Sequence, residues 1–135
     1  MIDDRDYLLD ITCLGVLIDF WNKMSEHETL YWTGRKEHDF EVDVREALKT
    51  CGVLAIKVPD KFSEYTFPDL LCHTRLASGK YLTWYMEMKA RNKKIKKGSN
   101  QESAFAVLGK ACPVFLVNNA KSLADALCEI KKLAL

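Results

Sequence analysis

The first part of the chain carries apolar side chains at the spacing of one long helix. Between residues 7 and 24 they recur three and four positions apart, at Leu8, Ile11, Leu14, Ile18 and Trp21. This period places them on one face of an α-helix, as a wide stripe that must be buried. We expect this helix to pack on the rest of the same chain; the alternative is packing against the same helix of a second subunit. Residues 25–37 show no pattern that assigns an element.

After residue 37 the apolar pattern alternates between helical spacing and short apolar runs. The predicted helices span residues 40–50, 101–110 and 122–133, and the predicted strands span residues 53–58, 69–74, 81–88 and 113–117. Ser122 and Asp125 resemble a capping box at the start of the last helix. The order helix, three strands, helix, strand, helix predicts an α/β sandwich with a mixed sheet, whose last strand is reached by a helical crossover.

Two of the predicted strands are expected to form a hairpin. The connection between them contains Gly79, a residue suited to a tight turn. With the turn centred on Ser78, the numbers of directly opposed residues add up to 156, so that Asp69 faces Glu87. Opposed residues share one face of a sheet with side chains about 5 Å apart, and Lys89, two positions beyond Glu87, returns to that face. The hairpin therefore brings two carboxylates and one ammonium group together.

Charged groups in this arrangement favour metal-dependent chemistry. Two adjacent carboxylates repel each other unless a cation lies between them, and their hard oxygen ligands suit Mg²⁺ or Mn²⁺. Such an ion would polarise a phosphoryl oxygen and lower the pKa of a bound water, while Lys89 could orient that water or offset developing charge. The alternative is a solvated ion pair at the end of a hairpin. The pattern indicates phosphodiester hydrolysis.

The same residues form a PD…ExK motif, which consists of Pro68, Asp69, Glu87, Met88 and Lys89. From about residue 38 onward the chain resembles the PD-(D/E)XK nuclease superfamily, most closely its VRR-NUC and archaeal Holliday-junction-resolvase-like members. In those proteins a glutamate on the first core helix, a glycine, a strand, the two motifs and a helix with a glutamine follow in this order. The resemblance implies a restriction-endonuclease-like nuclease core over residues 38–135, with residues 1–37 as an N-terminal helical extension.

The resemblance also assigns roles to the residues of the motif. Asp69 and Glu87 would be metal ligands, joined by the backbone carbonyl of Met88. Lys89 would be the catalytic lysine. The implied cofactor is Mg²⁺ or Mn²⁺.

Two further site residues are implied outside the motif. Glu41 would bind the metal directly or through water, and Gln101 would position the reacting groups. Each has an ordinary alternative, because Glu41 is also a first-turn acid favoured by the helix dipole and Gln101 follows two good N-cap residues. On the same predicted helix Glu46 is rotated by roughly 140° from Glu41, which makes Glu41 the better candidate.

Length and charge restrict the classes of protein that fit. A chain of 135 residues with 48% apolar residues can bury one core, and we expect one compact domain. The net charge of +1 excludes a binder that relies on a global basic field. A local patch follows the motif, and we call it the basic loop: Arg91, Lys93, Lys94, Lys96 and Lys97. It is expected to bind backbone phosphates of DNA without reading sequence, with a solvated loop as the alternative.

The cysteines and the start of the chain bear on localisation. The five cysteines are odd in number and lack CxxC spacing, so we expect reduced core residues. Cys72 and His73 are adjacent on a predicted strand and point to opposite faces, which disfavours a zinc site. The start of the chain is acidic where a signal peptide would be basic, which predicts a cytoplasmic protein in a reducing compartment.

These observations together predict a Mg²⁺-dependent DNA endonuclease. The nearest family members imply a homodimer that cuts branched or Holliday-junction DNA, each subunit supplying one site. A homing or restriction-like endonuclease would show the same motif. The alternative from another class is a non-catalytic nuclease-fold module that binds DNA or protein.

Overall fold

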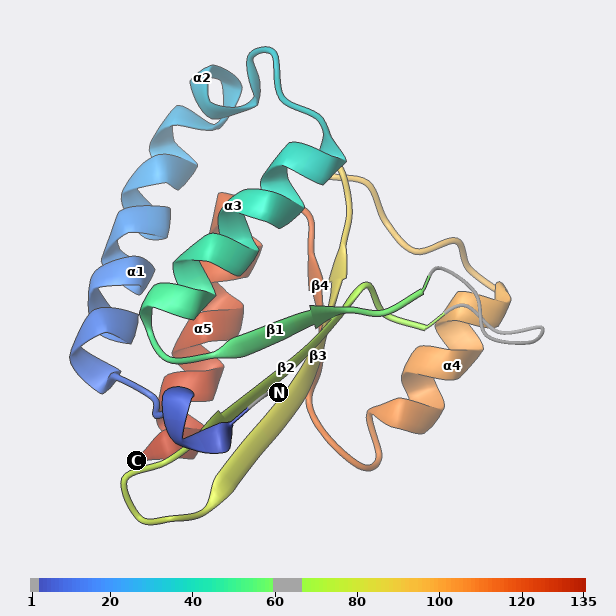
Figure 1. Ribbon diagram of the computed structural model, residues 1–135. Helices are drawn as coiled ribbons and strands as arrows, with labels where there is room; N and C mark the ends of the chain where they lie inside the picture. Colours follow the sequence, from blue (N-terminus) through green and yellow to red (C-terminus); the bar gives the residue numbers. More distant parts are fainter. Residues whose placement is uncertain (1–2, 60–66) are drawn as a thin grey trace.

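The computed structural model describes residues 3–59 and 67–135 (Figure 1). Its helices are α1 (Ile11–Met24), α2 (Glu28–Trp32), α3 (Glu37–Thr50), α4 (Asn100–Leu108) and α5 (Ala120–Ala134). Its strands are β1 (Leu54–Lys57), β2 (Leu70–Arg75), β3 (Tyr81–Met88) and β4 (Val114–Val117). Every predicted helix and strand is present within a few residues. The short helix α2 lies in the stretch that the apolar pattern left unassigned.

The described strands form one mixed sheet in the order β1-β2-β3-β4. β1 pairs antiparallel with β2 and β2 antiparallel with β3, whereas β3 and β4 are parallel and joined through α4. In the β2–β3 hairpin Leu70 opposes Met86 and Arg75 opposes Tyr81, so the predicted register is confirmed for these strands. The class is therefore α/β with a mixed sheet, as the sequence predicts.

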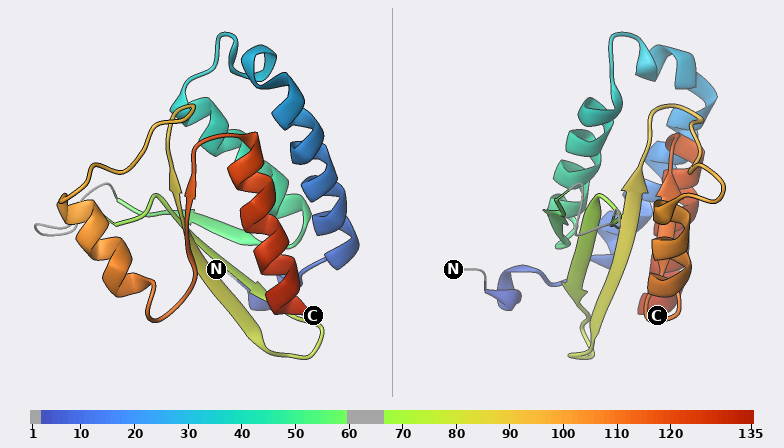
Figure 2. Two further views of the ribbon diagram at one scale, coloured as in Figure 1. Left: turned by 180° about the vertical axis from the view of Figure 1, so that it is seen from behind. Right: turned by 90° about the vertical axis from the view of Figure 1, so that its right-hand side faces the viewer.

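One face of this sheet forms the core. Alternate side chains of β2 and β3 are buried there in one cluster with side chains of α1, α3 and α5: Leu70, Cys72, Trp84, Met86 and Met88. α3 packs next to β1 and α5 next to β4, and α1 packs along α5 as an outer layer. α4 stands on the other side of the strands from these helices (Figures 1 and 2). Its buried Ala104 lies outside the main cluster.

The apolar stripe of α1 is covered by the same chain. Leu14 and Trp21 are buried against the core, which agrees with the intramolecular packing that we expected. Val16 and Phe20 remain exposed on the outer side of the helix. In the described part of the chain, no helix is both long and apolar enough to cross a membrane.

The segment before α1 docks on the end of β2. Arg75 donates its backbone N–H to the Tyr7 carbonyl at 2.8 Å, and Leu9 donates to the Arg75 carbonyl at 2.9 Å. The buried Thr74 hydroxyl lies 2.9 Å from the Tyr7 carbonyl oxygen and 2.8 Å from that of Gly52, at the turn between α3 and β1. The N-terminal extension thus shares hydrogen bonds and core with the predicted nuclease segment.

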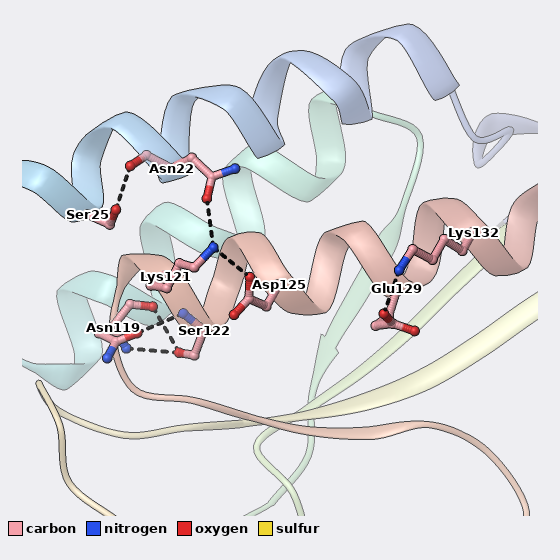
Figure 3. A network of polar contacts seen from close by, with 8 residues as sticks. All are labelled: Asn22, Ser25, Asn119, Lys121, Ser122, Asp125, Glu129 and Lys132. Atoms are coloured by element: carbon pink, nitrogen blue, oxygen red, sulfur yellow. Dashed lines mark hydrogen bonds and ion pairs between the residues drawn. The ribbon is translucent and has the colours of Figure 1, made fainter.

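Helix α5 begins two residues earlier than predicted, and its cap differs from the expected one (Figure 3). Asn119 is the N-cap: its side chain accepts from the Ser122 N–H at 2.7 Å, and the Ser122 hydroxyl accepts from the Asn119 N–H at 3.2 Å. The predicted Ser122 and Asp125 box is therefore wrong. Asp125 instead pairs with Lys121 at 3.0 Å, and Lys121 reaches Asn22 of α1 at 3.5 Å.

The structure corrects the prediction that all cysteines are reduced. Cys13 of α1 and Cys51, just after α3, form a disulfide, so the expectation of five reduced cysteines is wrong for this pair. The two residues are 38 positions apart in sequence, and only packing of α1 beside the end of α3 brings them together. The other cysteines, Cys72, Cys112 and Cys128, are free thiols.

Candidate active site

Asp69 and Glu87 meet at the open end of the β2–β3 hairpin. Asp69 directly precedes β2, and its Oδ2 accepts the Met88 backbone N–H at 2.8 Å, which extends the ladder through a side chain. Glu87 is almost fully buried, with 3% of its surface exposed. Since Met86 and Met88 point into the core, the pleat directs Glu87 to the opposite face. We call Asp69 and Glu87 the hairpin acids.

The electrostatics of Glu87 reflect this crowding. Its burial, together with a hydrogen bond to Asp69 and the negative charge of that residue, raises the pKa of Glu87 to about 9; Lys89 opposes the shift and Glu37 adds to it. The raised pKa favours the protonated form of Glu87 at neutral pH when no cation is bound. Its Oε2 has no hydrogen-bond partner among the described residues. A buried carboxyl oxygen without a partner is costly, and binding a cation would relieve that cost.

Lys89 lies at the edge of this pair. Its Nζ is 4.0 Å from Glu87 Oε1, and its side chain is 25% exposed. Its backbone N–H donates to the Val117 carbonyl at 3.0 Å, so β4 holds the strand at this point. The lysine can thus reach both the buried acid and a ligand arriving from solvent.

Glu41 lies elsewhere. It is 4% exposed, and its Oε2 is 3.4 Å from Lys57 Nζ and 3.9 Å from His38 Nδ1. Lys57 opposes Leu70, a core residue, so Glu41 lies toward the core side of the sheet. No contact joins Glu41 to the hairpin acids in the described ranges.

Glu37, and not Glu41, is the acid of α3 that contacts the segment next to the hairpin acids. It is the first residue of α3, one helical turn before Glu41, and its Oε1 accepts the Ala90 backbone N–H at 3.0 Å. It is also one of the charges that raise the pKa of Glu87. Sequence reasoning missed it because the helix was predicted to begin at residue 40. An acid at i−4 from a candidate helix acid lies on the same helical face and was the available signal.

Gln101 lies in the first turn of α4, half-buried. Ser99, one of the two N-cap residues that the sequence offered, caps this helix by accepting the Glu102 N–H at 3.2 Å. No hydrogen bond links Gln101 to the hairpin acids within the part of the chain described. The structure thus brings together Asp69, Glu87 and Lys89, and leaves Glu41 and Gln101 outside their contacts.

The basic loop follows directly from Lys89, and all five of its basic side chains are exposed. Its first half is fixed to the body. Asn92, with a positive φ of 60°, donates to the Asn118 carbonyl at 2.8 Å, and Asn118 Nδ2 donates back to the Lys93 carbonyl at 2.9 Å. Arg91 contacts the Thr29 hydroxyl at 3.2 Å. The loop therefore leaves the site along a defined path.

His73 and Cys72 lie apart from the hairpin acids and from each other's contacts. His73 Nδ1 lies 2.7 Å from the Thr83 hydroxyl and its ring stacks on Tyr81, at the far end of the hairpin. Cys72 is buried in the core, and burial raises the pKa of its thiol. Among residues 3–59 and 67–135, no cluster of three or more His, Cys, Asp or Glu side chains is arranged to hold a metal ion. A cation at the hairpin acids would therefore take its remaining ligands from Met88 carbonyl, water or substrate.

The raised pKa of Glu87 predicts a stability change with pH in the metal-free protein. In the unfolded chain its pKa is near 4.5, and the folded value is about 9. The contribution of protonated Glu87 is fully present below pH 4.5 and is lost as pH rises toward 9. In EDTA we expect Glu87→Gln, which cannot ionise, to unfold with a free energy about 3 kcal/mol above wild type at pH 7, and near wild type at pH 4. Urea unfolding at both pH values measures this; a variant less stable at pH 7 would contradict the burial of a proton on Glu87.

Comparison with known proteins adds no assignment. No protein-family model matches the chain, and comparison with the curated proteins and with solved structures found no significant match.

Proposed function

We propose that the protein is a metal-dependent nuclease that hydrolyses phosphodiester bonds of DNA at the hairpin acids. The observation that carries this proposal is the meeting of Asp69 with the buried Glu87, whose Oε2 lacks a partner among the residues described. A protein gains no stability from forcing two carboxyls together in a low-dielectric site. The arrangement is explained if a Mg²⁺ or Mn²⁺ ion binds there during function.

The residues of the chain fit such an ion. The Met88 N–H fixes the Asp69 carboxylate through Oδ2, and this carboxylate and Oε2 of Glu87 would bind the ion. When bound, the ion would supply Lewis-acid activation of a phosphoryl oxygen and of a water nucleophile. Lys89, at the edge of the site, would orient that water and offset negative charge as it develops on the phosphate.

DNA is the substrate class that the surroundings favour. The basic loop leaves the site immediately after Lys89, so its exposed cations would bind phosphates next to the scissile one. Such contacts position a duplex or junction and carry no sequence information. Preference for branched DNA and action as a homodimer extend the proposal on the strength of the resemblance alone. Incubation of linear, flapped and four-way-junction DNA with Mg²⁺ or Mn²⁺ tests activity and substrate together.

Metal binding gives a direct test that needs no substrate. We expect Mg²⁺ or Mn²⁺ at about a hundred times its Kd to raise the Tm of the wild type by roughly 5 to 10 °C, because the ion binds only the folded state. Asp69→Asn is expected to abolish the rise. Asp125→Asn, which removes an exposed acid of α5, is the control and should keep it.

A non-catalytic module is the second candidate. Its support is that the raised pKa of Glu87 lets the hairpin acids lie together without a cation, and that no third acidic ligand joins them in the described chain. Absence of any metal-induced shift in the wild type, with DNA binding retained, would favour this function over hydrolysis.

A further inference from the structure

Three consecutive backbone N–H groups around Lys89 are each held by a different part of the protein. Met88 N–H donates to Asp69 Oδ2 at 2.8 Å, and Lys89 N–H donates to the Val117 carbonyl at 3.0 Å. Ala90 N–H donates to Glu37 Oε1 at 3.0 Å. This short segment is therefore held by three groups from different elements. They are the side chain of Asp69 just before β2, a carbonyl of β4 and a side chain of α3.

The hydrogen bond from the Ala90 N–H differs from the other two because it lies beyond the ends of β3 and β4. Strand β3 ends at Met88, and β4 ends at Val117, so no strand partner is present for the Ala90 amide. Without Glu37 this N–H would be solvated, and the next backbone bond from this segment to the body would be the one from the Asn92 N–H to the Asn118 carbonyl. Just beyond, the backbone turns through Asn92 into the basic loop. Glu37 thus fixes the strand where it passes into that loop.

We propose that Glu37 is a positioning residue for Lys89, acting through the Ala90 N–H, and this inference rests on the proposed nuclease function. The side chain of Lys89 extends from a backbone held on both sides, with Asp69 at the preceding amide and Glu37 at the following one. A small displacement of this backbone would move Nζ, which now lies 4.0 Å from Glu87, by a comparable amount. Misplacement of a reacting group by about 1 Å is enough to lower a rate on the order of a hundredfold.

Glu37 could instead act through its charge, because it contributes to the raised pKa of Glu87. The two roles separate on substitution. In Glu37→Gln the amide oxygen can still accept the Ala90 N–H while the negative charge is gone. In Glu37→Ala both the acceptor and the charge are gone. Since Glu37 is exposed, neither change removes core packing.

The experiment measures kcat and KM for DNA cleavage in saturating Mg²⁺ with wild type, Glu37→Ala and Glu37→Gln. We expect Glu37→Ala to lower kcat roughly tenfold with KM nearly unchanged, and Glu37→Gln to restore kcat to within about threefold of wild type. Glu46→Ala, which removes another exposed acid of α3, is the control and should equal wild type. Equal losses in both Glu37 variants would overturn the positioning role in favour of charge, and wild-type kcat in Glu37→Ala would overturn any role.

A second readout does not depend on activity. Amide hydrogen exchange at Ala90 should be slow in wild type and Glu37→Gln, and at least about tenfold faster in Glu37→Ala. A wild type that never cleaves DNA refutes the proposed function, whereas unchanged exchange at Ala90 in Glu37→Ala refutes the positioning inference itself. The two failures are therefore distinguishable.

Discussion

Replacing Lys89 by alanine is expected to lower Mg²⁺-dependent DNA cleavage by a factor on the order of 10² to 10³ while the fold stays intact. The magnitude is that of removing one group that stabilises charge in the transition state of a partly buried site. Lys89 is the cation that opposes the rise in the pKa of Glu87, and its side chain is partly exposed, so it could meet a phosphate arriving from solvent. Single-turnover cleavage of labelled DNA, with enzyme in excess, measures the effect on chemistry.

Two controls sharpen this expectation. Lys80→Ala removes an exposed lysine at the opposite end of the same hairpin and should leave cleavage unchanged. Asp69→Asn and Glu87→Gln should reduce cleavage at least as strongly as Lys89→Ala, because they remove the ligands themselves. Retained cleavage in any two of the three site variants would move the active site elsewhere in the protein.

Replacing Gly52 by alanine is expected to destabilise the protein by about 4 kcal/mol, near the upper end for single substitutions. Gly52 has a φ of +82°, and a Cβ at this position would lie 1.9 Å from the backbone carbonyl oxygen of Leu8. That carbonyl belongs to the segment that docks on the end of β2, so it cannot move aside without breaking the bonds of Tyr7 and Leu9. Urea unfolding followed by circular dichroism gives the free energy of unfolding.

Gly79 provides a matched comparison. It has a similar φ of +89°, but a Cβ there would meet nothing within 4 Å. Gly79→Ala should therefore cost only the backbone term, about 1 kcal/mol. Equal losses in the two alanine variants would show that the N-terminal segment does not press on the turn after α3.

The hairpin register was predictable because two local signals agree. Strand alternation has a period of two, and Gly79 fixes the turn, so a slip by one residue would bury the wrong side of both strands. The meeting of Asp69 and Glu87 follows from that register and from the order of residues alone. Their roles in catalysis remain predictions.

The contact of Glu37 was harder to predict, because the sequence gives only a weak signal for where α3 begins. Lys36, which precedes α3, is not a favoured N-cap residue, and its side chain gives no cap hydrogen bond. The predicted start at residue 40 made Glu41 a first-turn acid, whereas α3 begins at Glu37 and Glu41 lies in its second turn beside Lys57. The three additional residues bring Glu37, which lies on the same helical face as Glu41, into the helix as its first residue.

The disulfide between distant cysteines could not be predicted from the sequence either. The bond between Cys13 and Cys51 depends on how α1 lies against the end of α3, and cysteine spacing cannot reveal that. The N-cap of α5 was predicted wrongly for a simpler reason. Asn119 and Ser122 are both good N-cap residues, and the prediction chose the later one.

Neighbouring residues of β3 point to opposite faces of the sheet, one packed in the core and one carrying Glu87. Met86 and Met88 are held by the interior, while Glu87 between them faces the other way. Random mutagenesis of this strand should therefore sort into two classes that alternate with every residue, one that lowers protein yield and one that leaves yield intact. Such a strand lets natural selection alter the face that carries Glu87 while the packed face keeps its composition.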